Sequence, residues 1–219
     1  MKKITVITGH YGSGKTNLSV NLAVKAAQEG KKVTVVDLDL VNPYFRTADF
    51  REMFADMGIK LIAPDFANSN LDVPSIQFDI EQLAKSEGCL IIDVGGDDAG
   101  AFALGRFAEA LNSYGDELDM LYVINQRRYF TENSGEAVSL MFEIERASRM
   151  KHTAVVNNTN LGCETTPEII GRSAEFAEQT AAAAGLPLAF TTCPEELCEL
   201  MDAKNIFPVK VYVKPLWDL

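Results

Sequence analysis

The sequence of 219 residues predicts an α/β fold in which a mostly parallel β-sheet is covered by helices on both faces. Short apolar runs rich in Val and Ile alternate with stretches whose apolar residues recur at helical spacing. The runs are apolar throughout, which is typical of strands buried on both faces of a sheet. No repeat, low-complexity tract or linker interrupts the alternation, so we expect a three-layer α/β/α sandwich and a single domain over residues 1–219.

The first strand, the loop after it and the first helix carry the most specific pattern in the chain. Residues 4–8 form a β-branched run, and residues 17–28 carry apolar residues at helical spacing. Between them, residues 9–16 read Gly-His-Tyr-Gly-Ser-Gly-Lys-Thr, which fits the phosphate-binding P-loop, G-x-x-x-x-G-K-[ST]. A strand, a glycine turn and a helix N-terminus place several backbone N–H groups around one point, where the helix dipole favours negative charge. The pattern predicts a nucleotide-binding domain of the P-loop NTPase type.

The position of each P-loop residue in the pattern predicts its role. Gly12 and Gly14 allow backbone angles and close approaches that a Cβ atom would block. Lys15 is expected to reach the β- and γ-phosphates and to act in catalysis, and the Thr16 hydroxyl to bind Mg²⁺. The residues predicted here to contact the nucleotide are Gly9, His10, Tyr11, Gly12, Ser13, Gly14, Lys15, Thr16 and Asn17.

The later elements follow the same alternation. The expected strands are residues 32–37, 59–63, 89–93, 120–125, 153–157 and 188–191. The expected helices are residues 47–57, 75–85, 100–112, 131–150, 167–184 and 195–203. The last segment, residues 206–219, contains two prolines and alternates like a strand, so we do not expect an amphipathic helix there.

Carboxylates follow two of the expected strands, at the sheet edge where parallel α/β folds bind ligands. Asp93 begins Asp-x-x-Gly and is expected to hold Mg²⁺, while the glycine N–H meets the γ-phosphate. Asp37 is expected to support Mg²⁺, and Asp39, further into the loop, to orient or accept a proton from the attacking water. We expect their strand to lie next to the P-loop strand.

Base recognition has weaker signals. Asn157 ends a strand and is predicted to contact adenine through its amide, with Thr192 and Pro194 lining the base pocket. No Asn-Lys-x-Asp sequence is present, so ATP is favoured over GTP as the bound nucleotide. Arg46 is open between contacting phosphate and covering the helix that follows. For Arg127 and Arg128, a surface or interface salt bridge is favoured over stabilising transition-state charge.

Composition limits the partners and the compartment. The formal net charge of −11 disfavours binding to nucleic acid or to anionic membranes. No segment is long and apolar enough for a membrane span, and the first residues lead directly into a strand rather than into a secretory hydrophobic region. The four cysteines form no C-x-x-C pair, which favours reduced, packing thiols in a cytoplasmic protein.

These motifs together resemble the MinD/ParA (CobQ/CobB-related) P-loop ATPases. The resemblance rests on Gly14-Lys15-Thr16-Asn17-Leu18, Asn21-Leu22-Ala23, Gly30-Lys31-Lys32-Val33, Asp37-Leu38-Asp39, Asp93-Val94-Gly95-Gly96 and Asn157, in this order over most of the chain. It implies a nucleotide-dependent homodimer with the phosphates near the subunit interface. By motif match, it implies phosphate and Mg²⁺ binding by Lys15 and Thr16, water orientation by Asp39 and a Walker-B role for Asp93.

The chain departs from that family pattern at His10, which occupies the usual place of a second lysine that reaches the partner's nucleotide. An imidazole is not a fixed cation at pH 7.

Three functions are therefore weighed. The leading one is a slow, Mg²⁺-dependent ATPase that acts as a dimer switch for an unknown protein partner. The second is an ATP-dependent ligase of the dethiobiotin-synthetase type, with Asp97, Asp98, Arg127 and Arg128 near a small-molecule pocket. The third is a nucleotide-binding regulator that does not hydrolyse ATP.

Overall fold

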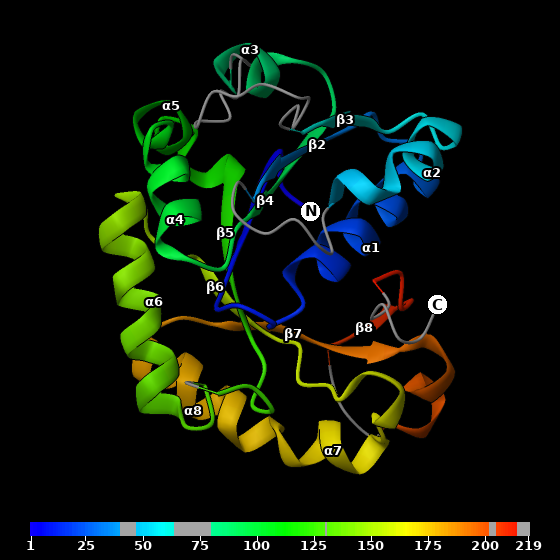
Figure 1. The fold of residues 1–219 in the computed structure, drawn as a ribbon, viewed down its shortest axis with the longest axis vertical. Coiled ribbons are helices and arrows are strands. Elements are labelled where there is room, and N and C mark those ends of the chain that lie inside the picture. Colours follow the sequence, from blue (N-terminus) through cyan, green and yellow to red (C-terminus); the bar gives the residue numbers. More distant parts are fainter. Residues whose placement is uncertain (40–46, 64–79, 130, 202–204, 214–219) are drawn as a thin grey trace, which may run out of the picture.

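The protein is described by a computed structural model covering residues 1–39, 47–63, 80–129, 131–201 and 205–213. Within these residues, eight parallel strands form one sheet in the order β3-β2-β4-β1-β5-β6-β7-β8 (Figure 1). The strands are β1 (Ile4–Thr8), β2 (Val33–Leu38), β3 (Lys60–Ile62), β4 (Cys89–Val94), β5 (Leu118–Ile124), β6 (Ala154–Asn157), β7 (Leu188–Pro194) and β8 (Ile206–Val209). The α-helices are α1 (Lys15–Gln28), α2 (Arg51–Asp56), α3 (Ile80–Lys85), α4 (Asp98–Gly105), α5 (Ala108–Asn112), α6 (Ser134–Ser148), α7 (Pro167–Arg172) and α8 (Ala174–Ala184).

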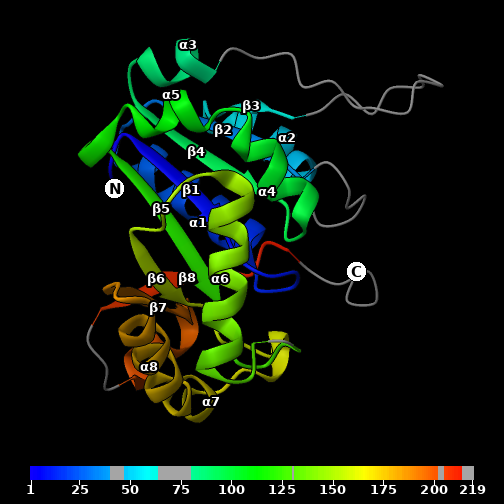
Figure 2. The ribbon, with the colours of Figure 1, turned by 90° about the vertical axis from the view of Figure 1, so that its left-hand side faces the viewer.

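Helices cover the sheet on both faces, which confirms the predicted α/β/α sandwich. On one face, α1 and α2 pack through Leu18 and Phe54 against strand residues such as Ile91. On the other face, α3, α4 and α5 pack against β1, β2 and β4, and α6 and α8 pack against β5 and β6. Figure 2 shows α4 and α6 in front of the sheet, with α1 behind it. Among the described helices, none combines the length and apolar character that crossing a bilayer requires.

Three expected helices are each divided in two. The helix expected at residues 47–57 is a 3₁₀-helix over Thr47–Phe50 followed by α2. The helix expected at residues 100–112 breaks after α4, where the N–H groups of Arg106 and Phe107 donate to carbonyls three residues earlier. The helix expected at 167–184 breaks at Ser173, whose hydroxyl donates to the Ile170 carbonyl at 2.7 Å. Asn157 at the end of β6 donates to the same hydroxyl at 2.9 Å, so a contact from the sheet fixes this break.

The end of the chain also differs in detail from the prediction. The helix expected at 195–203 is a 3₁₀-helix over Glu195–Leu200 in the described residues. The strand-like pattern after residue 205 forms β8, which lies at the edge of the sheet. Pro208 has no backbone N–H to donate to a neighbouring strand, and an edge strand tolerates this loss. The described part of the helix expected at 75–85 is α3, since residues 75–79 lie outside the described residues. The described residues also do not include Arg46 and residues 214–219.

The order of the strands corrects one expectation. β2 does not lie next to the P-loop strand, because β4 pairs with β1 on one side and with β2 on the other. Asp93 therefore lies between its register partners Ile7 on β1 and Asp37 on β2. This arrangement places the Asp93 carboxylate nearer to the P-loop than that of Asp37.

A buried polar network supports the strand that leads into the P-loop. The His152 ring lies 2.7 Å from the Thr8 hydroxyl through Nε2 and 3.3 Å from Glu145 Oε1 through Nδ1. Burial acts to raise the pKa of Glu145, but hydrogen bonds from His152 and Lys151 outweigh it and lower the pKa to about 2. Because the ionised carboxylate only accepts, Nδ1–H donates to Glu145 and Nε2 accepts from Thr8. Burial, the largest influence, lowers the pKa of His152 and keeps the ring neutral.

Candidate nucleotide-binding site

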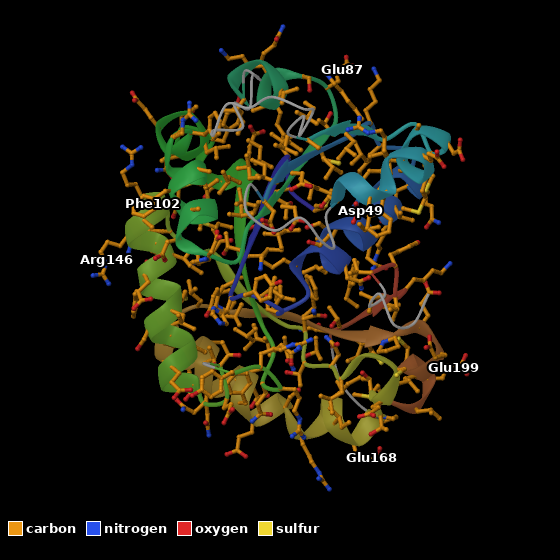
Figure 3. All side chains as sticks on the ribbon, in the orientation of Figure 1. Asp49, Glu87, Phe102, Arg146, Glu168 and Glu199 are labelled. Carbon is orange, nitrogen blue, oxygen red and sulfur yellow. The ribbon has the colours of Figure 1, made fainter. Side chains whose placement is uncertain are left out.

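The polar residues that end the strands meet at one edge of the sheet, because all the described strands are parallel. The P-loop follows β1, Asp39 follows β2, and the segment from Asp93 to Asp97 ends β4 and leads to α4. The acidic character of the chain is distributed elsewhere as well. Figure 3 shows Glu87, Glu168 and Glu199 on separate parts of the molecular periphery.

Three glycines give the P-loop its path. Gly9, Gly12 and Gly14 have φ angles of 149°, 74° and 86°, which L-residues with a side chain rarely adopt. A Cβ atom at Gly9 would collide with the Val123 carbonyl of β5, and one at Gly14 with the Asn158 amide. The loop is thus held tightly against the ends of β5 and β6.

The N-terminus of α1 is free to receive an anion. Gly14 is the N-cap residue, and because glycine has no side chain it makes no side-chain cap to the first turn. The unpaired N–H groups of a 14-residue helix, together with its dipole, form a site suited to phosphate. The geometry therefore agrees with the role that the sequence pattern predicts for this loop.

Lys15 lies inside the site, with only 7% of its surface exposed. Its Nζ donates to the His10 carbonyl of the same loop at 3.1 Å. Burial lowers the pKa of Lys15, while the nearby carboxylates of Asp93, Asp39 and Asp97 act in the opposite direction. The ammonium group is thus held between the phosphate loop and the acidic segments.

Asp93 is buried and has one oxygen without a partner. Its Oδ2 accepts a 2.6 Å hydrogen bond from the Thr47 hydroxyl. Its Oδ1 has no hydrogen-bond partner among the described residues. Burial raises the pKa of Asp93, whereas Thr47, Lys15 and the hydroxyl of Thr16 act to lower it. A buried carboxylate oxygen with no partner, beside a threonine hydroxyl, is a donor set that suits Mg²⁺.

The segment after Asp93 packs directly on the P-loop. A Cβ atom at Gly96 would lie 2.7 Å from the Tyr11 nitrogen and 2.8 Å from Lys15 Nζ. A Cβ atom at Gly95 would lie 3.3 Å from an oxygen of Asp39. Asp97 then caps α4 by accepting from the Gly100 N–H at 2.8 Å. Residues 93–97 therefore connect the phosphate loop to a helix on the opposite face of the sheet from α1.

Residues 4–171 match the CobQ/CobB/MinD/ParA nucleotide binding domain. The chain belongs to this family. It is 44% identical over 52 residues to the Bacillus subtilis tyrosine-protein kinase YwqD, covering 24% of this chain and 22% of the kinase. It is 33% identical over 87 residues to an iron-sulfur cluster carrier protein of Saccharolobus solfataricus, covering 34% of this chain and 29% of the carrier. The chain thus matches less than a third of the length of each of these curated relatives.

Solved structures with the same fold are more distant in sequence. The cell division protein FtsY of Thermotoga maritima superposes with a TM-score of 0.59 at 17% identity, over 89% of this chain and 63% of FtsY. Signal recognition particle 54 kDa protein of Aeropyrum pernix, solved in complex with GDP, gives a TM-score of 0.54 at 16% identity, over 87% of this chain and 41% of that protein. These similarities show the fold of a P-loop NTPase in this family member.

The residue at the family's second-lysine position is electrically neutral. Burial is the main cause that lowers the pKa of His10, and the charge of Lys15 lowers it further. His10 therefore does not supply a second fixed positive charge at pH 7. Its carbonyl, however, orients the Lys15 ammonium.

The structure does not favour the predicted contact between Asn157 and adenine. The Asn157 amide is fully buried, donates to Ser173 and accepts from Thr159 at 2.8 Å and 3.2 Å. The neighbouring Asn158 instead contacts the P-loop, where it donates to the Ser13 carbonyl at 2.6 Å and accepts from the Thr192 hydroxyl. Thr192 thus holds the Asn158 side chain that contacts the P-loop. Pro194, which ends β7, remains a predicted base contact.

Asn17 is occupied by another part of the fold. Its amide donates to the Lys210 carbonyl at 3.0 Å and accepts from the N–H groups of Tyr212 and Val213 at 2.8 Å and 3.2 Å. Asn21, one turn later, binds both backbone groups of Lys210. The side chain of Asn17 therefore holds the segment after β8 on α1, which leaves only its backbone for the predicted nucleotide contact.

Sequence reasoning missed two residues that shape the site, Thr47 and Asn158, and it expected a third, Asp97, only as part of a small-molecule pocket. Thr47 donates a hydrogen bond to Asp93, and Asp97 accepts one from the start of α4. Asn158 donates to the P-loop at the Ser13 carbonyl. Thr47 and Asp97 each lie at a helix start, which is a signal that sequence offers. Asn158 directly follows the predicted residue, Asn157, and the two asparagines differ only in the direction of their side chains.

Proposed function

We propose that this P-loop NTPase binds ATP with Mg²⁺ and hydrolyses it slowly as a nucleotide-driven dimer switch for a protein partner. The observation that carries the proposal is that buried Lys15, at the start of α1, lies close enough to buried Asp93 of β4 to affect its pKa, while Asp93 Oδ1 has no hydrogen-bond partner within the part of the chain that the structure describes. A buried cation beside a buried free carboxylate oxygen suits a phosphate–metal pair between them.

The chain's own groups divide the work of binding. The N–H groups at the start of α1 and the P-loop backbone hold the phosphates, and Lys15 neutralises their charge. The residues that would hold Mg²⁺ are Thr16 and Asp93, with Asp37 behind them on the neighbouring strand. A Mg²⁺ ion held by these residues would supply positive charge that offsets the negative charge developing on the phosphates.

Asp39 is the residue that we assign to the attacking water. Its backbone N–H donates to Asp37 at 2.9 Å, which fixes the turn after β2. An oxygen of its carboxylate lies against Gly95, on the same side as the acidic segment that approaches Lys15. A carboxylate at this place orients a water molecule and accepts its proton.

The switch is assigned to the segment of residues 93–97. Because Gly96 contacts both Tyr11 and Lys15, a terminal phosphate that engages Lys15 changes the space available to this segment. The segment continues into α4 through the Asp97 cap, so its position is passed on to a helix. In a nucleotide-dependent homodimer, which the family resemblance implies, this movement would alter the surface offered to a partner.

One set of measurements tests the proposal. Phosphate release, ATP and GTP affinity, and molar mass by light scattering are compared for the wild type and Lys15→Ala, with and without a non-hydrolysable ATP analogue. Slow turnover, preference for ATP and a larger mass with the analogue are expected for the wild type alone. Tight binding without turnover would indicate the regulator instead, and turnover only with an added carboxylate metabolite would indicate the ligase.

A further inference from the structure

Arg128 lies over the P-loop. A Cβ atom at Gly12, in the middle of the loop, would lie 3.3 Å from Nε, 3.4 Å from Cδ and 3.5 Å from Cζ of Arg128. The planar end of this side chain therefore packs against the glycine that has no side chain of its own. A larger residue at position 12 would displace the guanidinium.

The backbone that carries Arg128 is anchored at several points. The Arg128 N–H donates to the Asn125 carbonyl at 3.2 Å, and the Arg128 carbonyl accepts from the N–H and hydroxyl of Thr131, both at 3.1 Å. Asn125 and Thr131 are themselves buried, at 0% and 2% exposure. This turn follows β5, whose first five residues pair with all of β1. The side chain thus extends from a fixed base to the neighbouring phosphate loop.

The charge of Arg128 is available for an anion. Across the ranges that the structure describes, no ion pair or hydrogen bond reaches its guanidinium. The other cation of the loop, Lys15, is buried and faces three carboxylates, and His10 is neutral. Arg128 is exposed to solvent, so its side chain can turn toward a ligand without leaving a buried position.

We propose that Arg128 binds the phosphate chain of the nucleotide held by its own subunit. The guanidinium carries several N–H donors in one plane, which match the oxygens of phosphate in pairs. From its place over Gly12, it would close the solvent side of the phosphates, while Lys15 holds their inner side. This inference rests on the proposed function, since it needs a bound nucleotide, and it adds a binding residue after β5.

Nucleotide affinity of two neighbouring arginine variants tests the assignment. Binding of ATP and of ADP is measured by calorimetry for the wild type, Arg128→Ala, Arg128→Lys and Arg127→Ala, at a concentration where light scattering shows monomers. Arg127→Ala removes the same charge from the same turn and is expected to change affinity by less than about twofold. Arg128→Ala is expected to weaken ATP binding by about tenfold or more, and Arg128→Lys to lie between it and the wild type. Unchanged thermal unfolding without nucleotide shows that the variants are folded.

The results separate this inference from the proposed function. If the wild type binds ATP and Arg128→Ala binds it as Arg127→Ala does, the inference is wrong and the proposed function stands. If the loss appears only at concentrations where the protein is dimeric, Arg128 acts on the partner's nucleotide and the assignment to its own subunit is wrong. If the wild type binds neither nucleotide, the proposed function itself fails.

Discussion

The contact between Gly96 and the P-loop gives the most specific prediction for a single substitution. In Gly96→Ala, the new methyl group would lie 2.7 Å from the Tyr11 nitrogen and 2.8 Å from both Tyr11 Cα and Lys15 Nζ. Two of these atoms belong to the backbone of the phosphate loop, so the segment after Asp93 has to move away. Overpacking of this kind costs about 1–3 kcal/mol of unfolding free energy. Because the same movement displaces the switch segment from Lys15, we expect phosphate release to fall by about tenfold or more.

The assay pairs urea unfolding, followed by circular dichroism, with phosphate release at saturating ATP. Gly171→Ala is the matched control, since a Cβ atom there meets nothing within 4 Å and the residue lies inside α7. The control is expected to keep wild-type turnover and to gain at most about 1 kcal/mol of stability from its higher helix propensity. Wild-type stability and turnover in Gly96→Ala would refute the packing of this segment on the loop.

Three further predictions concern the rest of the fold. The pKa of His152 is lowered in the folded protein, so on acidification the unfolded chain binds the proton first. The free energy of unfolding should therefore fall as the pH drops below about 6.5, the pKa of a free histidine. Urea titrations between pH 8 and pH 5 measure this, and an unchanged free energy of unfolding would contradict the buried neutral ring. Burial raises the pKa of the Cys193 thiol to about 12, whereas Cys163 is exposed. Iodoacetamide should therefore modify Cys163 before Cys193, as followed by mass spectrometry. Equal modification rates at the two cysteines would be inconsistent with the structure. Asn21→Ala removes the hydrogen bonds to Lys210 and should lower the unfolding free energy by about 1–3 kcal/mol in urea, an effect that a loosely held C-terminal segment would not produce.

The fold was predictable because its signals are local in the sequence. Each apolar run between helical stretches corresponds to a strand, and the P-loop pattern fixes the strand, turn and helix around residues 9–16 together. The order of the strands in the sheet, in contrast, has no local signal in the sequence. Nothing near Asp37 in the sequence indicates that β4 rather than β1 pairs with its strand, because that choice depends on contacts between distant segments.

The site shows the same division. Lys15 and Asp93 are predictable because their spacing within a motif is tied to their chemistry. In the structure both are buried, and Lys15 lies close enough to Asp93 to affect its pKa. Asn157 and Asn158 are adjacent and chemically identical, so only the direction in which each side chain leaves β6 tells which one contacts the P-loop. The sequence does not decide the role of Arg128 for a related reason, since the path of its turn, and therefore what its side chain covers, is not visible in the sequence.

The central claim is that Lys15 and Asp93 form a site for a nucleoside triphosphate and Mg²⁺. Calorimetric titration of ATP into the wild type, Lys15→Ala and Asp93→Asn, each with Mg²⁺ and with EDTA, tests it most directly. We predict that Mg²⁺ strengthens ATP binding to the wild type, that Asp93→Asn loses most of this strengthening, and that Lys15→Ala binds at least about tenfold more weakly. Equal ATP affinity in the wild type and Lys15→Ala, with no response to Mg²⁺, would contradict the account.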